Sequence, residues 1–456
     1  MDTLHRVCAG LDVHKDTVVA CVRRLDDRGR PHQEVKTFGT TTPDLLELLD
    51  WLLGQQVPLV AMESTGVYWK PIFNLLEGPV EVLLVNPEHI KKVPGRKTDV
   101  KDCEWIAQLL QHGLLKASFV PPRPIRDLRD LTRQRSQLVG EKASVSNRIQ
   151  KVLEDANLKL GSVASDVLGV SGRDMLRALL AGVDSGEALA NRARGRLRDK
   201  LPPLRKALTG RVTEHHRFLL GMHLDHLTHL ETLIGRLDQR IGKEMEKDRP
   251  PEPPEPKPPG VSPEPASAEK PGTPVDVQES SAQAAKGSGG LGLWQSLWLL
   301  VTIPGITRRT AEVVLAEIGT DMSRFATPQH LASWAGLCPG NNESAGKRRS
   351  GRTTHGDKWL RSILVQAAWA ASHTKATYLS SQYRRLARRR GKKKALVAVA
   401  HTLLVMCYEV LKKGEAYHEL GADYLDKLEP DRRTNQLVRQ LEKLGHKVTL
   451  EPKAVA

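Results

Sequence analysis

Apolar, β-branched runs alternate with amphipathic runs from the N-terminus to Gly113, and this pattern predicts an α/β domain. The first two runs flank a short polar turn at residues 14–16 and predict a β-hairpin. A strand near Glu34–Phe38 completes an antiparallel meander. Further strands are expected at residues 58–64 and 80–86, and helices at residues 42–54, 65–78 and 99–113.

Beyond Pro124 the apolar residues recur every three or four positions between abundant charged residues, which predicts long helices. They pack as a hairpin or a coiled coil, and a stand-alone bundle and a dimerising coiled coil are both open. Five histidines lie in the later part of this region. Two or three of them could bind zinc, but a solvated helix face explains them better. The histidines are His215, His216, His223, His226 and His229.

Eleven prolines lie between Pro250 and Pro274, followed by a Ser-, Ala-, Gly- and Gln-rich stretch to Gly290. Such a segment cannot build a core, so we expect an extended or disordered linker between two folded parts. The part after it reads as mostly helical. Pro304–Gly305 lies between two apolar helices and resembles the turn of a helix-hairpin-helix, whose backbone amides could receive a DNA phosphate. A plain corner in a helical bundle is the alternative.

Five regions are therefore expected. They are an α/β domain at 1–122, a helical or coiled-coil segment at 123–247, the linker at 248–290, a helical domain at 291–420 and a C-terminal tail at 421–456.

The charge of the chain indicates what kind of partner it binds. The formal net charge is +16 and the pI is near 9.6, which points to a polyanion such as nucleic acid. Between Ala345 and Lys394 fifteen Lys or Arg face a single acid, Asp357. We interpret this run as a phosphate-binding surface rather than a solubility tail, because apolar helical stretches interrupt it.

The five cysteines are scattered without a CxxC pair, which suits a reducing compartment. No apolar run reaches eighteen residues, and the N-terminus lacks the pattern of a signal peptide. We therefore expect no membrane association and a cytoplasmic, nucleoid-associated protein.

Four carboxylates are the candidate chemistry. Asp12 and Glu63 end predicted strands, and Asp99 and Asp102 share one face at the start of a predicted helix. If that helix docks beside the strand ends, the carboxylates converge as oxygen ligands for Mg²⁺ and support phosphoryl transfer. Each also has a structural explanation: Asp12 as a turn residue, Glu63 as a helix-dipole partner and Asp99 as an N-cap.

Five stretches of the sequence, taken in order, resemble one family. They are GLDVHKDT, AMESTGVYW, VNPEHIKKVPGRKTDVKDCEWIAQLL, IPGITRRTAEVVLAEIG and NNESAGKRRSGRTTHGDKWLRSILVQAA. They resemble the RuvC-like DEDD transposases of bacterial insertion sequences that carry a C-terminal serine domain, and the related Piv-type DNA invertases. The resemblance implies a ribonuclease-H-like (RuvC-like) first domain in which Asp12, Glu63, Asp99 and Asp102 bind Mg²⁺. It also implies a serine nucleophile in the second domain and a structured bridge RNA as guide.

Ser344 is the best match to that serine, and Ser350, which precedes Gly351, is the second candidate. Without the resemblance, Ser344 would be read as a polar loop residue. Four nearby cations could hold the scissile phosphate and its developing charge. They are Lys347, Arg348, Arg349 and Arg352.

Three functions are compatible with these features. The first is an RNA-guided DNA recombinase that joins donor and target DNA through a phosphoserine link and works as a homo-oligomer, a dimer or tetramer. The second is a RuvC-like hydrolytic nuclease, such as a junction resolvase, which leaves the serine domain unexplained. The third is a non-enzymatic DNA-binding scaffold, which leaves the carboxylates unexplained.

Overall fold

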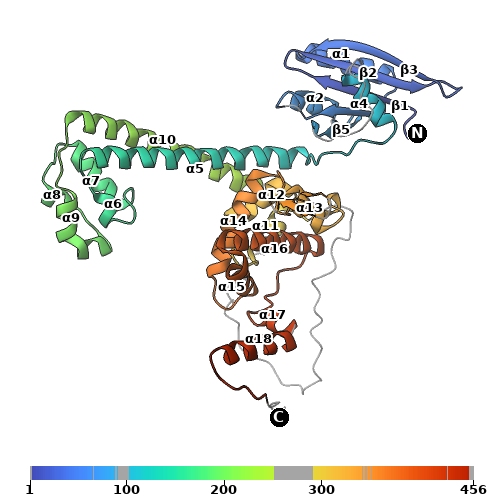
Figure 1. Ribbon diagram of the computed structural model, residues 1–456. Helices are drawn as coiled ribbons and strands as arrows, with labels where there is room; N and C mark the ends of the chain where they lie inside the picture. The colour runs from blue at the N-terminus through green and yellow to red at the C-terminus, as the bar shows by residue number, and fades with distance from the viewer. Residues whose placement is uncertain are drawn as a thin grey trace, which may run out of the picture. The chain divides into compact units, whose positions relative to one another are not determined.

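The computed structural model describes most of the chain and divides it into two compact units, with the division between Pro121 and Pro122. Figure 1 shows the helices and strands of both units. The described residues are 3–64, 66–87, 90, 102–250, 291–340, 342–344, 347–350, 352–428 and 430–450.

The N-terminal unit is built on a five-stranded mixed sheet in the order β3-β2-β1-β4-β5. Strands β1, β2 and β3 form the expected antiparallel meander, whereas β4 and β5 run parallel to β1. The strands are β1 (Val7–Val13), β2 (Thr17–Leu25), β3 (Pro31–Gly39), β4 (Leu59–Glu63) and β5 (Glu81–Val85).

Helices cover both faces of this sheet. Alternate residues of β1 and β4, such as Leu11 and Met62, pack with α1 (Thr42–Gly54) and α2 (Trp69–Leu76) in one core. The intervening residues face α4 (Asp102–Gln111), whose apolar side chains form a second core with them. The predicted α/β N-terminal domain is therefore observed, with a mixed sheet.

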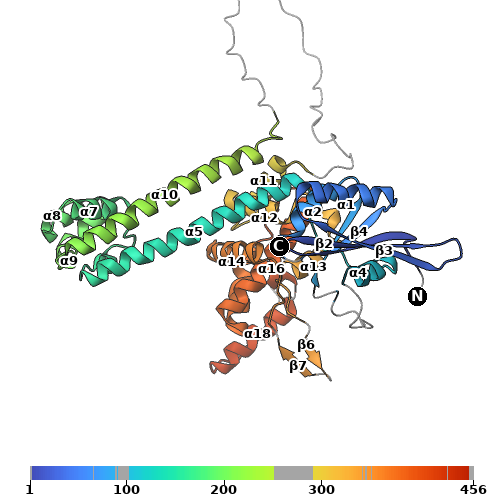
Figure 2. The ribbon, with the colours of Figure 1, turned by 90° about the horizontal axis from the view of Figure 1, so that it is seen from above.

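Two long helices, α5 (Arg123–Asp155) and α10 (Glu214–Met245), lie side by side in the second unit, as both views show (Figures 1 and 2). They are antiparallel, because His216 at the start of α10 contacts Asp155 at the end of α5 over 2.9 Å. Short helices pack at that end of the pair. They are α6 (Leu160–Val163), α7 (Val170–Leu180), α8 (Gly186–Ala190), the 3₁₀ helix η1 (Gly195–Lys200) and α9 (Leu201–Ala207). This region is a helical hairpin within one chain.

The remaining described residues are mostly helical and gather around α16 (Lys392–Lys413), which packs against α11, α13, α14 and α15. The elements before it are α11 (Leu293–Val301), α12 (Arg308–Ile318), η2 (Met322–Arg324), α13 (Pro328–Trp334), α14 (Lys358–His373) and α15 (Tyr378–Arg390). Two helices follow it, α17 (Tyr424–Leu428) and α18 (Pro430–Lys443).

One small sheet interrupts the helical region and was not predicted from the sequence. Strands β6 (Asn342–Ser344) and β7 (Lys347–Ser350) pair antiparallel. Its charged sequence, KRRS in β7, lacks the apolar alternation that marks a half-buried strand.

The predicted linker begins and ends at neighbouring points. The backbone N–H of Trp294 donates a hydrogen bond to the Asp248 carboxylate at 3.0 Å, and the Arg249 guanidinium lies 5.0 Å from the centre of the Trp294 ring. Residues 251–290 lie outside the described chain. Both flanks belong to the second compact unit, so the proline-rich segment does not separate the two units.

Among the described helices, α16 is long and apolar enough to cross a membrane by length and composition alone. Core helices of soluble proteins pass the same test, and half of its most apolar window is buried inside the protein.

Candidate functional site

Asp12 and Glu63 lie level with each other at the carboxyl ends of adjacent strands. Parallel β1 and β4 pair Leu11 with Met62, and Asp12 and Glu63 are the next residue of each strand. Since side chains alternate along a strand, both carboxylates point away from the core that holds Leu11 and Met62. They therefore share the sheet face that α4 covers.

The start of α4 comes to the same end of the sheet. A Cβ atom on Gly10 would lie 2.4 Å from the carbonyl oxygen of Cys103 and 2.4 Å from the amide nitrogen of Ala107, so only glycine permits this close packing. At the other end of α4, Arg23 on β2 donates a hydrogen bond to Gln111 at 3.1 Å. Helix α4 thus runs antiparallel to β1, and its first residue, Asp102, lies toward Asp12 and Glu63.

These carboxylates differ in exposure. Asp12 is half-buried and accepts a hydrogen bond from His14 Nε2 at 3.1 Å. Glu63 is half-buried, and Asp102 is exposed. The sequence analysis did not predict a role for His14 beside Asp12. The Asp-x-His spacing at the end of the strand is the sequence signal for this contact.

Three of the four predicted metal ligands therefore share one edge and one face, and all three offer oxygen donors, which suits a hard divalent cation. The fourth, Asp99, lies outside the described residues. Within the described part of the chain, no three His, Cys, Asp or Glu side chains are already gathered closely enough to hold a metal ion.

The two candidate nucleophiles lie on the two strands of the small hairpin. Ser344 ends β6 opposite Lys347, and Ser350 ends β7 opposite Asn342. The backbone thus places Ser344 beside the connection between the strands and Ser350 at the other end of the ladder. Arg348 pairs with Glu343 in the same hairpin, and Arg349 lies between Arg348 and Ser350.

The base of this hairpin is closely packed. Gly340 donates a backbone hydrogen bond to the carbonyl of Arg352 at 2.8 Å. Next to this hydrogen bond, a Cβ on Gly356 would lie 2.2 Å from the amide nitrogen of Gly336. The backbones at Gly336 and Gly356 are therefore in contact. Asp357 then caps α14 by accepting from the amides of Trp359 and Leu360. The side chain of Arg352, a predicted phosphate ligand, is exposed.

The turn at Pro304–Gly305 packs on α14. Gly305 has a φ of +88°, and a Cβ there would lie 2.6 Å from the carbonyl oxygen of Ala367. This contact accounts for the glycine through packing within the bundle. The helix-hairpin-helix interpretation, with phosphate binding at Pro304 and Gly305, stays a prediction.

The histidines of α10 are spread around the helix. His216 is buried and contacts Asp155 and Thr213 as part of the helix cap. His226 and His229 are exposed, while burial, Arg148 and His226 lower the pKa of His223. These positions agree with helix capping and a solvated face.

Two known protein families match separate parts of the chain. Residues 9–157 match a transposase family of the IS110 DEDD type. Residues 298–384 match the transposase family IS116/IS110/IS902. Both matches describe transposases. The chain belongs to the IS110 family of transposases.

Curated relatives match over a limited region. The chain is 33% identical over 122 residues to the pilin gene-inverting protein of Moraxella bovis, which covers 26% of this chain and 38% of that one. It is 32% identical over 125 residues to a putative transposase of Sinorhizobium fredii, covering 26% of this chain and 32% of that one. The chain thus spans about a third of the length of these relatives.

A comparison with solved structures returns the RuvC structure of Thermus thermophilus. That match has 16% sequence identity and a TM-score of 0.18, and it covers 25% of this chain and 84% of that one.

Proposed function

We propose that the chain is a Mg²⁺-dependent DNA recombinase of an insertion sequence, which cuts and exchanges strands through a serine–DNA intermediate. The names of the relatives, a gene-inverting protein and a transposase, support recombination as the reaction class. The observation that carries the proposal is the common edge and face of Asp12, Glu63 and Asp102.

In this proposal Asp12, Glu63 and Asp102, together with Asp99, hold the metal. A bound divalent cation would supply charge stabilisation for phosphoryl transfer. The carboxylates of this edge would hold the ion through oxygen atoms, and the hydrogen bond from His14 restricts the rotation of the Asp12 carboxylate.

Ser344 is the proposed nucleophile, with Ser350 as the alternative. The Ser344 hydroxyl loses its proton and its oxygen bonds to the scissile phosphorus. The phosphorus–oxygen bond to the leaving deoxyribose breaks, and that oxygen gains a proton. A hydroxyl of another strand then reverses the step and releases the serine. The phosphodiester energy is kept, so joining needs no external energy source.

Lys347, Arg348, Arg349 and Arg352 are proposed to hold the phosphate during this step. The substrates would be donor and target DNA, and a structured bridge RNA would guide their pairing. We further propose a homo-oligomer, a dimer or tetramer, that acts in the bacterial cytoplasm at the nucleoid.

Transfer of a DNA label to the protein tests the proposal. Protein, labelled donor and target DNA and candidate guide RNA are incubated with Mg²⁺, denatured and separated. We expect labelled protein from the wild type and from Ser350→Ala, and none from Ser344→Ala. Ser344→Cys keeps a trace of label, because a thiol can also attack phosphorus.

A peptide map that places the label on Ser350 would overturn the Ser344 assignment. Cleaved DNA with free 5′-phosphate ends and no labelled protein would instead identify the hydrolytic nuclease. Omitting the RNA in a parallel reaction tests guidance separately from chemistry.

A further inference from the structure

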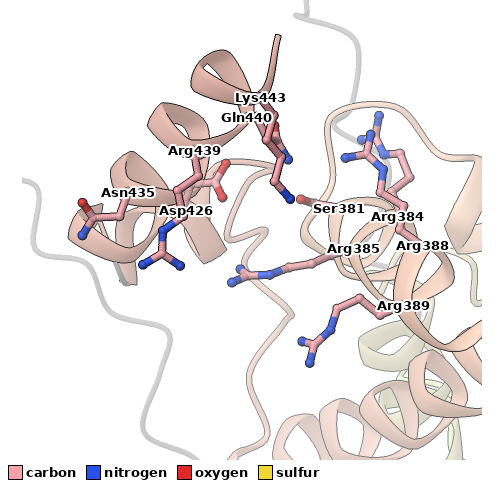
Figure 3. A pocket seen from close by; sticks show the side chains of 10 residues that line it. All are labelled: Ser381, Arg384, Arg385, Arg388, Arg389, Asp426, Asn435, Arg439, Gln440 and Lys443. Carbon is pink, nitrogen blue, oxygen red and sulfur yellow. The ribbon is translucent and has the colours of Figure 1, made fainter. Parts of the chain in front are cut away.

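An open groove lies between α15 and the C-terminal helices α17 and α18, outside the sites described above (Figure 3). Its volume is about 980 Å³. Most of its ten lining residues lie beyond residue 384, where the second family match ends. The groove therefore belongs largely to a part of the chain that the family comparison does not describe.

One wall of the groove is a row of arginines on α15. Arg384, Arg385, Arg388 and Arg389 are spaced so that they project from one side of the helix. All four are exposed. Arg384 Nε donates a hydrogen bond to the carbonyl of Ser380 at 3.2 Å, and Arg385 Nη1 donates one to the carbonyl of Leu425 at 3.3 Å.

The opposite wall is also basic. Arg439 and Lys443 are four residues apart on α18 and line the same opening. Figure 3 shows Arg385 and Lys443 pointing into the space between the helices. A single acid, Asp426, lies among the lining residues. The described lining therefore holds six cations and one carboxylate.

Facing walls of like charge repel each other. A polyanion between the walls removes the repulsion and releases counterions. None of the described residues that line the groove is aromatic, and binding of single strands depends strongly on base–aromatic stacking. This favours a nucleic acid whose bases are already paired and which presents its phosphates.

We propose that the α15–α18 groove binds the phosphodiester backbone of a base-paired nucleic acid, either duplex DNA or a helical part of an RNA. This inference rests on the proposed function for the presence of nucleic acid, and it adds a site distinct from the cations near Ser344. The contacts are to phosphates, so binding in the groove is independent of sequence.

Salt-dependent binding of the full chain tests the groove. The variant is Arg439→Gln with Lys443→Gln, and the matched control is Arg192→Gln with Arg196→Gln. The control removes the same charge from exposed arginines near η1. Binding is measured without divalent metal, so that strand cleavage plays no part. The probes are duplex DNA, hairpin RNA and single-stranded DNA of matched length.

We expect the groove variant to bind a base-paired probe roughly tenfold more weakly, with the slope of log K against log salt reduced by about 1.8 for duplex DNA. The control changes both quantities much less. Arg439→Lys with Lys443→Arg keeps the charge and restores binding. Circular dichroism of each variant checks that the helices remain.

A stronger effect on duplex DNA than on hairpin RNA assigns the groove to DNA, and the reverse assigns it to RNA. Equal losses of affinity in the variant and the control, or an unchanged salt slope, would overturn the groove as a binding site. An equal loss on single strands would overturn the choice of a base-paired ligand. In either case the label-transfer result of the proposed function is unaffected. A wild-type chain that binds none of the probes would overturn both.

Discussion

Arg133 on α5 and Glu317 on α12 form a two-pronged ion pair, with nitrogen–oxygen distances of 2.8 and 2.7 Å. Glu317 is fully buried, and the same guanidinium also reaches Asp357, the N-cap of α14, at 2.9 Å. One arginine therefore ties the helical hairpin to two helices of the C-terminal region. Removing one partner of a buried pair leaves the other charge uncompensated in the interior.

Removing Arg133 is expected to destabilise the second unit in a pH-dependent way. Burial raises the pKa of Glu317 to about 7 against an ordinary value of 4.5, despite the hydrogen bonds from Arg133. Between pH 4.5 and about 7, Glu317 is therefore protonated in the folded state and ionised in the unfolded state. The contribution of Glu317 to stability is therefore present below pH 4.5 and is lost as pH rises through about 7.

For Arg133→Ala we expect a loss of about 3 kcal/mol in the free energy of unfolding at about pH 8. The loss is smaller at about pH 5.5, because a protonated Glu317 needs no counter-charge. Denaturant unfolding followed by circular dichroism measures the free energy of unfolding at each pH. The control is Arg194→Ala, which breaks an exposed pair with Asp174 and should cost less than about 1 kcal/mol at either pH. A pH-independent loss would contradict the role assigned to Glu317.

A methyl group on Gly10 is expected to displace α4. In Gly10→Ala the new Cβ meets backbone atoms of Cys103 and Ala107 at 2.4 Å, so the helix and Asp102 must shift. We expect a loss of about 1–3 kcal/mol in stability together with a loss of strand transfer. Gly54→Ala, where no atom lies within 4 Å, is the control and should retain both. Normal strand transfer in Gly10→Ala would show that the position of α4 is unimportant.

Neutralising the carboxylates is expected to stop strand transfer without unfolding the protein. Asp12→Asn, Glu63→Gln and Asp102→Asn should each lower its rate by at least about a thousandfold in Mg²⁺. Their melting temperatures should stay level or rise, because repulsion among neighbouring carboxylates falls. Asp50→Asn, an exposed acid on α1, is the matched control. If Asp12→Asn reacted at the wild-type rate, Asp16 would become the candidate ligand.

Shortening the proline-rich segment is expected to leave the fold intact. The hydrogen bond from Trp294 to Asp248 brings its flanks together, so a short Gly-Ser loop can replace residues 251–290. A loop closes at a cost that grows slowly with its length, so the shorter loop should keep or slightly raise the melting temperature. Differential scanning calorimetry checks this. Loss of the cooperative transition would show that the segment is structural.

Much of the N-terminal unit could be predicted from the sequence, because alternation and capping are local signals. The strands and helices around Asp12 and Glu63 appear where the pattern places them. Even the common edge of these two carboxylates follows from parallel strands. The direction of α4 could not be predicted, since it depends on the contact between Gly10 and Cys103, which are distant in sequence.

The C-terminal region was less predictable. Periodicity identifies the apolar face of a helix but not its partner, so the ties from Arg133 to Glu317 and Asp357 were not foreseen. The β6–β7 hairpin was missed because strands of three and four residues rich in charge carry no alternation. The basic run that ends at Lys394 is visible in the sequence. That its arginines face Arg439 and Lys443 across a groove can be seen only in the folded structure.

The tie from Arg133 to Asp357 joins residues that are 224 positions apart. At a synthesis rate of about 5–20 residues per second, roughly 10 to 45 s pass between the appearance of the two residues. During that interval the nascent helical hairpin has its own apolar contacts but lacks the acids that neutralise its basic end. A chain that ends within the intervening segment would therefore leave the Arg133 guanidinium without Glu317 and Asp357, its two partners in the C-terminal region.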